Sequence, residues 1–391
     1  MNILFTFLSL PHLTEAGLFN DLIKEFHKLA TSFSPNTKLG VNKEAGIDVL
    51  RFKTDQLTRN KSNIKKGIAY IKYIFQANSA IRKHFRKENF VLIIAHSLPP
   101  ESGILIRNLK RRYKASFYLI LCDYIWQNAV SLGFIKKKGV ICKYYKMMES
   151  VLIKNSDYIG TPSQGNIDFI TNIYPAVKNK NVKILHHSQA PVVLKDCNKV
   201  ALKKKFDLEN KFIVVYGGNV SIAQKMENVI DLAAECLQYE EIVFLIIGRG
   251  PTMDAIKEDV QKRGINNVRF IEFMPKNEYE ELISICDVGI VSLNEKLGVP
   301  NIPSKTLSYF SQSIPIVASI DKVTDYGEYL ETAQAGLWSI AGDIDSFKNN
   351  LIKLYENPDL VKKMGKNGNK FYLENMLSEK AYATIMKQIE K

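Results

Sequence analysis

Short apolar runs alternate with longer amphipathic segments along the whole chain. The apolar runs predict strands at residues 2–8, 47–52, 91–95, 116–121, 158–160 and 182–185, then at 212–216, 242–247, 268–271, 288–292 and 315–319. Helical spacing of apolar residues predicts helices at 17–30, 64–85, 101–114, 138–155 and 163–173, and helical pattern fills 344–390. Such apolar strands separated by helices are typical of a parallel sheet covered on both faces.

A polar stretch without periodicity, at about residues 187–210, interrupts this alternation. The 391 residues are enough for two or three domains. We therefore expect an α/β chain of two doubly wound, Rossmann-like domains that face a cleft. The expected bounds are 1–190 and 191–372, followed by a terminal helix at 373–391. In such folds ligands bind at the carboxyl ends of the strands.

Three loops at predicted strand ends of the second half could bind phosphate. After the strand at 288–292, Pro303 suits a first helical turn and places Ser304 and Lys305 at the helix start. A second loop carries the glycine pair 217–218 before a helix expected from about residue 224, and a third reads Gly248-Arg249-Gly250. Alone, each could be an ordinary turn with a solvated cation, but three on one sheet favour a phosphate site.

The first half offers fewer candidates. Gly17 follows the first strand and would admit a ligand closely, and Asp123 follows an apolar strand. Asp123 could face the cleft or could cap a helix. His96 also ends a strand, and a structural histidine is the alternative there; the pair His186 and His187 at the domain junction could serve a hinge or a ligand. No Ser-His-Asp order, HExxH or paired metal carboxylates stand out.

Positive charge is concentrated in the first half of the chain. Residues 1–190 hold 29 Lys and Arg against 12 Asp and Glu, a balance of +17, whereas the remainder balances at −3. A basic half predicts an anionic partner or surface. Its clusters include Arg111 and Arg112, and a second set in which Lys136, Lys137, Lys138, Lys143 and Lys146 alternate with apolar and aromatic residues.

Basic and apolar residues mixed in this way suit an interfacial membrane face, and solvated helix faces are the alternative. Nucleic acid is disfavoured because no recognised motif accompanies the charge. No apolar run approaches the roughly 18–20 residues of a membrane span. The first ten residues lack the pattern of a signal peptide. The five scattered cysteines argue for a reducing compartment and against a zinc site or disulfide framework.

Several segments together resemble the family 4 glycosyltransferases, retaining enzymes of the GT-B fold, in the branch that builds bacterial capsule, O-antigen and exopolysaccharide. These are LSLPHLTEAGLFNDLIKEF, LCDYIWQNAVSLG, TPSQGNIDFI, YGGNVSIAQKMENVIDLA, IIGRGP, FMPKNEYEELISICDVGIVSL, IPSKTLSYFSQSIPIVAS and AGLW. The resemblance implies a hexosyltransferase-type enzyme that moves a sugar from a nucleotide-sugar, with a UDP-sugar favoured, to a polyprenyl-diphosphate-linked saccharide. It implies a basic, membrane-facing acceptor domain first, a donor domain second, and a last helix that crosses back.

The same resemblance implies the site residues. The donor diphosphate would lie near Gly17, Gly218, Arg249 and Lys305, with the base near Met274. Asn219 and Gln224 occupy the positions of a basic pair, as in the polysaccharide branch, and Asn301 and Ser308 replace two glutamates, beside Ser304. Asp123 would position the acceptor or receive its proton. Lys136, Lys137, Lys138, Arg111 and Arg112 would serve the acceptor and membrane. No metal or cofactor is implied, because cations neutralise the leaving diphosphate.

Loss of the two glutamates leaves other functions open. A non-catalytic GT-B partner of a polysaccharide-synthesis complex is the main alternative. A GT-B sugar-nucleotide epimerase would explain the donor domain but not the basic half, and a nucleic-acid binder ranks below both. The interpretation places the protein in the cytoplasm, peripheral on the inner face of the cell membrane.

Overall fold

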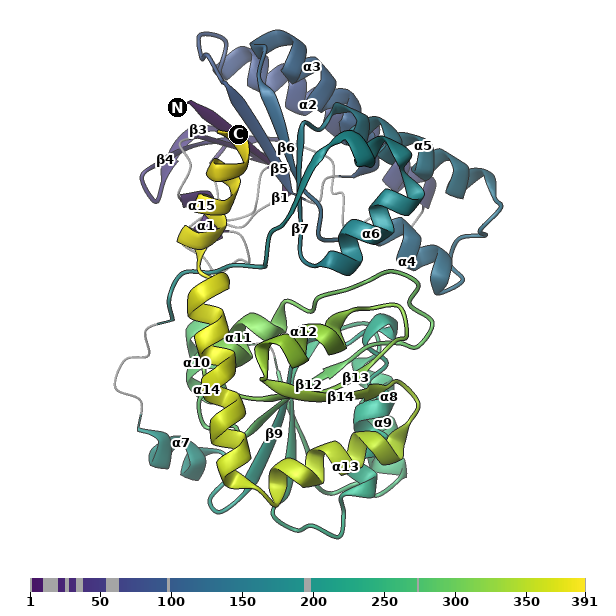
Figure 1. Ribbon diagram of the computed structural model, residues 1–391, viewed down its shortest axis with the longest axis vertical. Coiled ribbons are helices and arrows are strands. Elements are labelled where there is room, and N and C mark those ends of the chain that lie inside the picture. Colours follow the sequence, from purple (N-terminus) through teal and green to yellow (C-terminus); the bar gives the residue numbers. More distant parts are fainter. Residues whose placement is uncertain are drawn as a thin grey trace. The chain divides into compact units, whose positions relative to one another are not determined.

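The computed structural model describes residues 2–9, 20–24, 28–32, 38–53, 63–96, 99–192, 198–272 and 274–390. The chain divides into two compact units (Figure 1). Unit 1 comprises Met1–Ala190 with Ser378–Lys391, and unit 2 comprises Pro191–Leu377. Each unit has its own parallel sheet flanked by helices, so the predicted α/β class with two doubly wound domains is confirmed.

The sheet of unit 1 has the strand order β3-β4-β2-β1-β5-β6-β7-β8. All described pairings are parallel except β3 with β4. Its strands are β1 (Ile3–Ser9), β2 (Lys28–Ser32), β3 (Gly40–Glu44), β4 (Ile47–Phe52), β5 (Leu92–His96), β6 (Ser116–Ile120), β7 (Tyr158–Thr161) and β8 (Asn181–Ile184).

Helices cover this sheet, and the last helix of the chain packs with them. Tyr118 on β6 donates to Gln388 on α15 at 2.8 Å, and Ile385 of α15 joins the buried core of the sheet. The helical elements are α1 (Asn20–Lys24), α2 (Asn63–His84), η1 (Pro100–Ser102), α3 (Gly103–Tyr113), α4 (Ile125–Ser131), α5 (Val140–Asn155), α6 (Gln164–Ile173), η2 (Pro175–Asn179) and α15 (Ser378–Ile389).

Two strands of unit 1 correct the sequence-based assignment. Residues 28–30, predicted as the end of a helix at 17–30, belong to β2, which pairs with both β1 and β4. Pairing on both sides outweighs the weak helical spacing here. The edge strand β3 was not predicted because its residues are mostly polar; a turn with positive φ at Ala45 and Gly46 joins it to β4. Arg51 and Glu44 form a buried ion pair at 2.7 Å between these strands.

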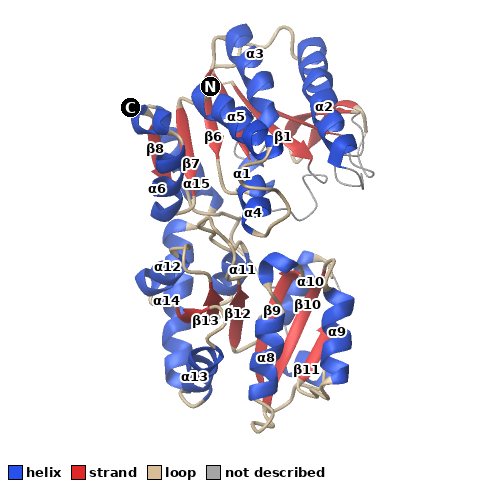
Figure 2. Cartoon of the chain, turned by 90° about the vertical axis from the view of Figure 1, so that its right-hand side faces the viewer, coloured by secondary structure: helices blue, strands red, loops and turns tan. Residues whose placement is uncertain are grey.

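The sheet of unit 2 is entirely parallel, with the order β11-β10-β9-β12-β13-β14 and helices on both faces (Figure 2). Sequence analysis missed β14. The strands are β9 (Phe212–Asn219), β10 (Ile242–Arg249), β11 (Val268–Ile271), β12 (Val288–Ser292), β13 (Ile316–Ile320) and β14 (Gly336–Ile340). The helices are α7 (Lys199–Lys205), η3 (Ile222–Gln224), α8 (Glu227–Glu235), α9 (Met253–Lys262), α10 (Lys276–Ile283), α11 (Lys305–Ser311), α12 (Tyr326–Ala333), α13 (Ile344–Tyr355) and α14 (Pro358–Asn375).

From β9 the chain adds β10 and β11 on one side of the sheet, and it then returns to add β12, β13 and β14 on the other side. The order in which the strands are added therefore reverses between β9 and β12. The carboxyl ends of strands beside such a reversal are the usual ligand position in an open parallel sheet. Among the described residues, no helix combines the length and apolar character that a bilayer crossing requires.

Candidate functional site

Glycines bring the carboxyl ends of β9 and β10 unusually close. Gly218 pairs with Gly248, and Asn219 pairs with Arg249. A Cβ on Gly248 would lie 1.9 Å from the Gly218 carbonyl oxygen, and Gly248 has a φ of +153°. Any side chain there would force the strands apart. The exposed side chains of Asn219 and Arg249 thus leave adjacent strand ends, where the sequence placed two of the phosphate loops.

Lys305 extends from α11 over the end of β9. The Tyr309 hydroxyl anchors this helix, since it accepts from the Gly217 amide at 3.0 Å and donates to the Val215 carbonyl at 3.1 Å. Lys305 lies one turn earlier, and its Nζ is 3.4 Å from the centroid of the Tyr216 ring. The position that a Cβ on Gly218 would take is 3.9 Å from this Nζ. The end of β9 and the start of α11 therefore meet at the Lys305 amine.

The environment of the Lys305 amine is unusual. Its Nζ is buried and has no hydrogen-bond partner among the residues that the structure describes. Burial lowers the pKa of Lys305 well below its ordinary value. A ring face attracts a cation but accepts no full hydrogen bond, so the donors of this group stay unsatisfied. An anion placed against Nζ would remove that penalty and restore the charge.

The helix α11 begins two residues later than predicted. Ser304 is its N-cap residue without a side-chain cap bond, and Pro303 lies outside it. α11 has only seven residues, so we base the phosphate assignment on the Lys305 side chain rather than on the helix end. The exposed Ser304 lies beside that lysine.

Ser308 and Asn301 have defined partners. Ser308 donates to Glu280 of α10 at 3.1 Å, and Gln312 donates to the other carboxylate oxygen at 3.4 Å. Burial raises the pKa of Glu280. The Glu280 carboxylate of α10 thus lies beside the Ser308 hydroxyl of α11. The backbone of Asn301 bonds in both directions with the Thr324 hydroxyl, which fixes the loop before α11.

Of the remaining donor candidates, two lie farther along these loops and one lies outside the residues that the structure describes. Gln224, in η3, accepts from the Ser221 hydroxyl at 2.5 Å. Met274, half-buried, lies just before α10. Gly17 is not among the described residues. Sequence analysis missed Tyr216 and Glu280. Tyr216 is the last residue of β9 before the glycine pair, but nothing local to the chain indicates that Lys305 covers its ring.

Asp123 lies at the carboxyl end of β6 in unit 1, with an exposed side chain. It does not cap the next helix: the N-cap of α4 is Tyr124, and no side-chain cap bond is formed there. The chain is held at this point because Leu121 donates to Gly160 at 2.8 Å and accepts from the Thr161 hydroxyl at 2.9 Å. Asp123 is therefore presented by a rigid strand end, and the capping alternative does not apply.

The basic candidates of unit 1 fall at opposite ends of its sheet. Lys136, Lys137 and Lys138 precede α5, on the side where β6 ends. Arg111 and Arg112 close α3, which leads into the start of β6, and Arg112 stacks 5.5 Å from the Tyr113 ring centroid. The two groups expected to act together are thus separated by the length of β6.

Of the three candidate histidines of unit 1, His96 and His187 are buried and His186 is half-buried. His96 ends β5, and His186 and His187 follow β8. Burial, then the neighbouring His187, lowers the pKa of His96, and the same causes lower the pKa of His186 to about 4. His96 and His186 are therefore neutral at physiological pH, which favours the structural alternative for His96. Within the described ranges, no group of three or more potential metal-ligating side chains occurs.

Solved structures of other proteins share this fold. The structure is similar to that of Anabaena HepE in complex with UDP-glucose, with a TM-score of 0.72, 13% identity, and coverage of 100% of this chain and 99% of that one. The fold is thus GT-B, two Rossmann-like α/β domains. Residues 198–371, most of unit 2, match the family described as Glycosyl transferases group 1.

Two relatives agree with this family. WcaI of Escherichia coli (strain K12), named as a colanic acid biosynthesis glycosyl transferase, is 29% identical over 138 residues, which cover 35% of this chain and 34% of WcaI. WbjE of Pseudomonas aeruginosa, named as a glycosyltransferase, is 22% identical over 297 residues, which cover 74% of this chain and 72% of WbjE. The chain thus spans about a third of the length of the first relative and most of the second.

Proposed function

We propose that this protein is a retaining glycosyltransferase of family 4 that moves a sugar from a UDP-sugar to a polyprenyl-diphosphate-linked saccharide in bacterial surface-polysaccharide synthesis. The observation that carries the donor assignment is the buried Lys305 Nζ beside the glycine end of β9, which has no hydrogen-bond partner within the described part of the chain. HepE, which has the same fold, binds UDP-glucose. The name of WcaI supports a role in polysaccharide synthesis.

In this proposal unit 2 binds the donor. The Lys305 ammonium and the Arg249 guanidinium neutralise the diphosphate, whose bond to the sugar breaks as UDP leaves. The close approach of β9 and β10 at Gly218 and Gly248 lets the diphosphate reach backbone as well as side chains. Asn219, Gln224 and Ser304 supply neutral hydrogen bonds around it, and Met274 lies near the base. Charge neutralisation of this kind needs no metal ion or other cofactor.

Unit 1 binds the acceptor. Asp123 positions the acceptor hydroxyl or takes its proton as the new glycosidic bond forms. Lys136, Lys137 and Lys138 attract the anionic acceptor and the inner face of the cell membrane, which the +17 balance of residues 1–190 also favours. Arg111 and Arg112, at the other end of the sheet, bind a more distant part of the same anionic surface.

Sugar transfer by the purified protein tests the proposal. We expect Asp123→Asn to lower transfer from a UDP-sugar to a polyprenyl-diphosphate saccharide by about 10²–10⁴-fold, the usual contribution of a proton-transfer group. UDP binding, measured by calorimetry, should be unchanged in this variant. Wild-type activity in Asp123→Asn would contradict the role of Asp123.

A non-catalytic partner protein remains the second candidate, because the Ser308 hydroxyl is engaged by Glu280 and Asn301 carries no charge. That function predicts binding of UDP-sugars, or of none, with no transfer to any lipid-linked acceptor. The same calorimetric and transfer assays on the wild-type protein separate the two.

A further inference from the structure

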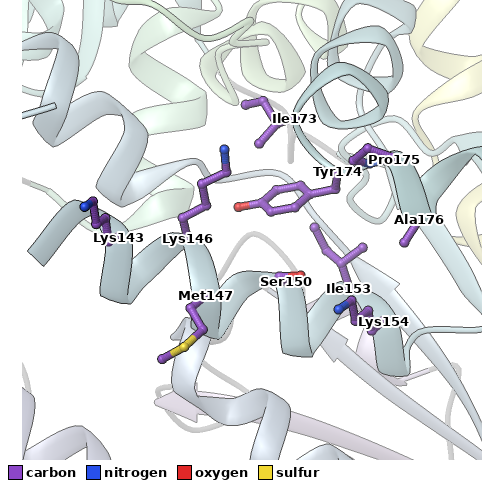
Figure 3. Close-up of a pocket in the computed structure, with 10 residues that line it drawn as sticks. All are labelled: Lys143, Lys146, Met147, Ser150, Ile153, Lys154, Ile173, Tyr174, Pro175 and Ala176. Carbon is purple, nitrogen blue, oxygen red and sulfur yellow. The ribbon is translucent and has the colours of Figure 1, made fainter. Parts of the chain in front are cut away.

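A pocket of about 560 Å³ lies in unit 1, between α5 and the turn that joins α6 to η2 (Figure 3). Its volume falls within the roughly 300–1,000 Å³ of small-molecule sites. α5 supplies one wall with Lys143, Lys146 and Lys154, and Ile173 and Pro175 belong to the other. The sugar-transfer reaction proposed above uses none of these residues.

The pocket is positively charged without compensation. Its lining includes three lysines and no acidic residue, and within the described ranges none of the three ammonium groups has an ion pair. The acidic residue of α5, Glu149, is buried and accepts hydrogen bonds from Gln127, at 2.6 Å, and from Tyr174. Burial raises the pKa of the Glu149 carboxyl, and no described ion pair joins it to the three lysines, so the pocket complements an anion.

An exposed apolar strip runs along α5 beside this pocket. At 100° per residue, the three lysines and Met147 share one arc of the helix. Val140 lies next to Met147 around the helix axis, and Ile141 lies about 100° beyond Val140. Val140 is 83% exposed, Ile141 56% and Met147 55%. Met147 also lines the pocket. A ligand that fits this surface is anionic at one end and apolar at the other.

We propose that this pocket binds the phosphate headgroup of an anionic membrane lipid, while Val140, Ile141 and Met147 enter the acyl region. The inference rests on the membrane placement in the proposed function and gives it a specific site. Lysines on an amphipathic helix attract anionic lipids, and the exposed apolar side chains add buried area on insertion. A soluble phosphate ester would use the lysines but would leave the apolar strip in water.

Vesicle co-sedimentation tests the proposal. We expect the full chain to sediment with phosphatidylcholine vesicles that contain phosphatidylglycerol, and not with phosphatidylcholine alone. The double variant Lys143→Gln/Lys146→Gln should partition about 30-fold less, from the usual contribution of two lysines at an anionic surface. The matched control is Lys363→Gln/Lys366→Gln on α14 of unit 2, with the same spacing and two exposed lysines. Equal binding to neutral vesicles, or an equal loss in the control, would overturn the proposal.

A charge-neutral variant separates the pocket from general attraction. Ser150→Phe fills the pocket from α5, and Ala176→Phe fills it from the opposite wall. Both should weaken binding to the anionic vesicles although they add apolar area. Melting temperatures show whether each variant is folded. If Ser150→Phe does not fold, Ala176→Phe provides the test. Undiminished binding by a folded pocket-filled variant would refute the site.

Two further measurements identify the source of the phosphate and separate this inference from the proposed function. Glycerol phosphate in solution should not release the protein from vesicles; release at millimolar concentration would assign the pocket to a soluble ester instead. UDP-glucose binding is measured on the same variants. Intact UDP-glucose binding with no vesicle binding refutes only the lipid site, whereas vesicle binding without any nucleotide-sugar binding refutes only the donor assignment.

Discussion

Replacement of Lys305 by methionine should affect stability and ligand binding in opposite directions. Methionine matches the length of the lysine carbon stem and removes the amine. The Nζ of that amine is buried 3.4 Å from the Tyr216 ring centroid, without a hydrogen-bond partner among the described residues. An unsatisfied buried donor costs about 1–3 kcal/mol. The lowered pKa means that the amine gains little cation–π attraction to offset this cost. We therefore expect Lys305→Met to increase the free energy of unfolding by about 1–2 kcal/mol.

The same substitution should weaken binding of UDP and UDP-sugars. A hydrogen bond between a charged group and an anion contributes about 1.5–3 kcal/mol, and about 1.4 kcal/mol corresponds to a factor of ten. The dissociation constant should thus rise roughly 10- to 100-fold. Gain of stability with loss of binding is typical of a functional group that the fold tolerates at a cost.

Denaturant unfolding and calorimetry with UDP check both effects, with Lys296→Met as the matched control. Lys296 is exposed and lies in the loop before α11, so its replacement should leave both quantities nearly unchanged. A Lys305→Met protein that is less stable than wild type would show that the ammonium is satisfied in the free protein. Unchanged UDP affinity would refute the assignment of Lys305 to the diphosphate.

The pH dependence follows from the sign of the Lys305 shift. The unfolded state holds its proton up to about pH 10.4, whereas the folded state releases it at lower pH. Between these two values stability rises with pH in the wild type, and Lys305→Met removes this slope. A bound diphosphate raises the pKa of the amine, so binding takes up a proton and affinity falls as pH rises above the free-state pKa. Calorimetry in buffers of different ionisation enthalpy measures the uptake; none observed would contradict a neutral amine.

Two further substitutions test the architecture of unit 2. Gly248→Ala should destabilise the protein by more than about 2 kcal/mol, because the new Cβ would lie 1.9 Å from the Gly218 carbonyl oxygen. The control is Gly264→Ala, at a φ of +63° with no atom within 4 Å of the new Cβ, which should cost only about 1 kcal/mol. Denaturant unfolding measures both losses. Similar losses would show that the strands can separate freely. Glu280→Gln keeps a hydrogen-bonding side chain and removes the ionisable carboxyl, whose pKa is raised in the folded protein. The unfolded state of the wild type releases this proton first, so the wild type should lose stability relative to Glu280→Gln as pH rises above about 4.3. Parallel pH profiles of the two proteins would contradict a buried, readily protonated carboxyl.

The sequence alone determined the class of fold and the loops on which the candidate phosphate-binding residues lie. Buried parallel strands are apolar along their whole length, so β9, β10 and β12 were visible as short runs, and their carboxyl ends identified Gly218, Arg249 and Lys305. Polar edge positions carry no such signal. For that reason the edge strand β3 was missed. The interior strand β2 was assigned to a helix because its pairing with β1 and β4 is a tertiary contact that local spacing does not report.

Only the tertiary structure decided how these residues are placed. Lys305 could have been a solvated lysine, but the bonds of Tyr309 to β9 hold it over Tyr216, 89 positions earlier in the chain. The carboxylate beside Ser308 comes from Glu280 on another helix. Arg111 and Lys136, both basic in sequence, separate to opposite ends of β6. Sequence periodicity reports which face of an element is buried, whereas contacts between distant elements depend on packing that no local pattern encodes.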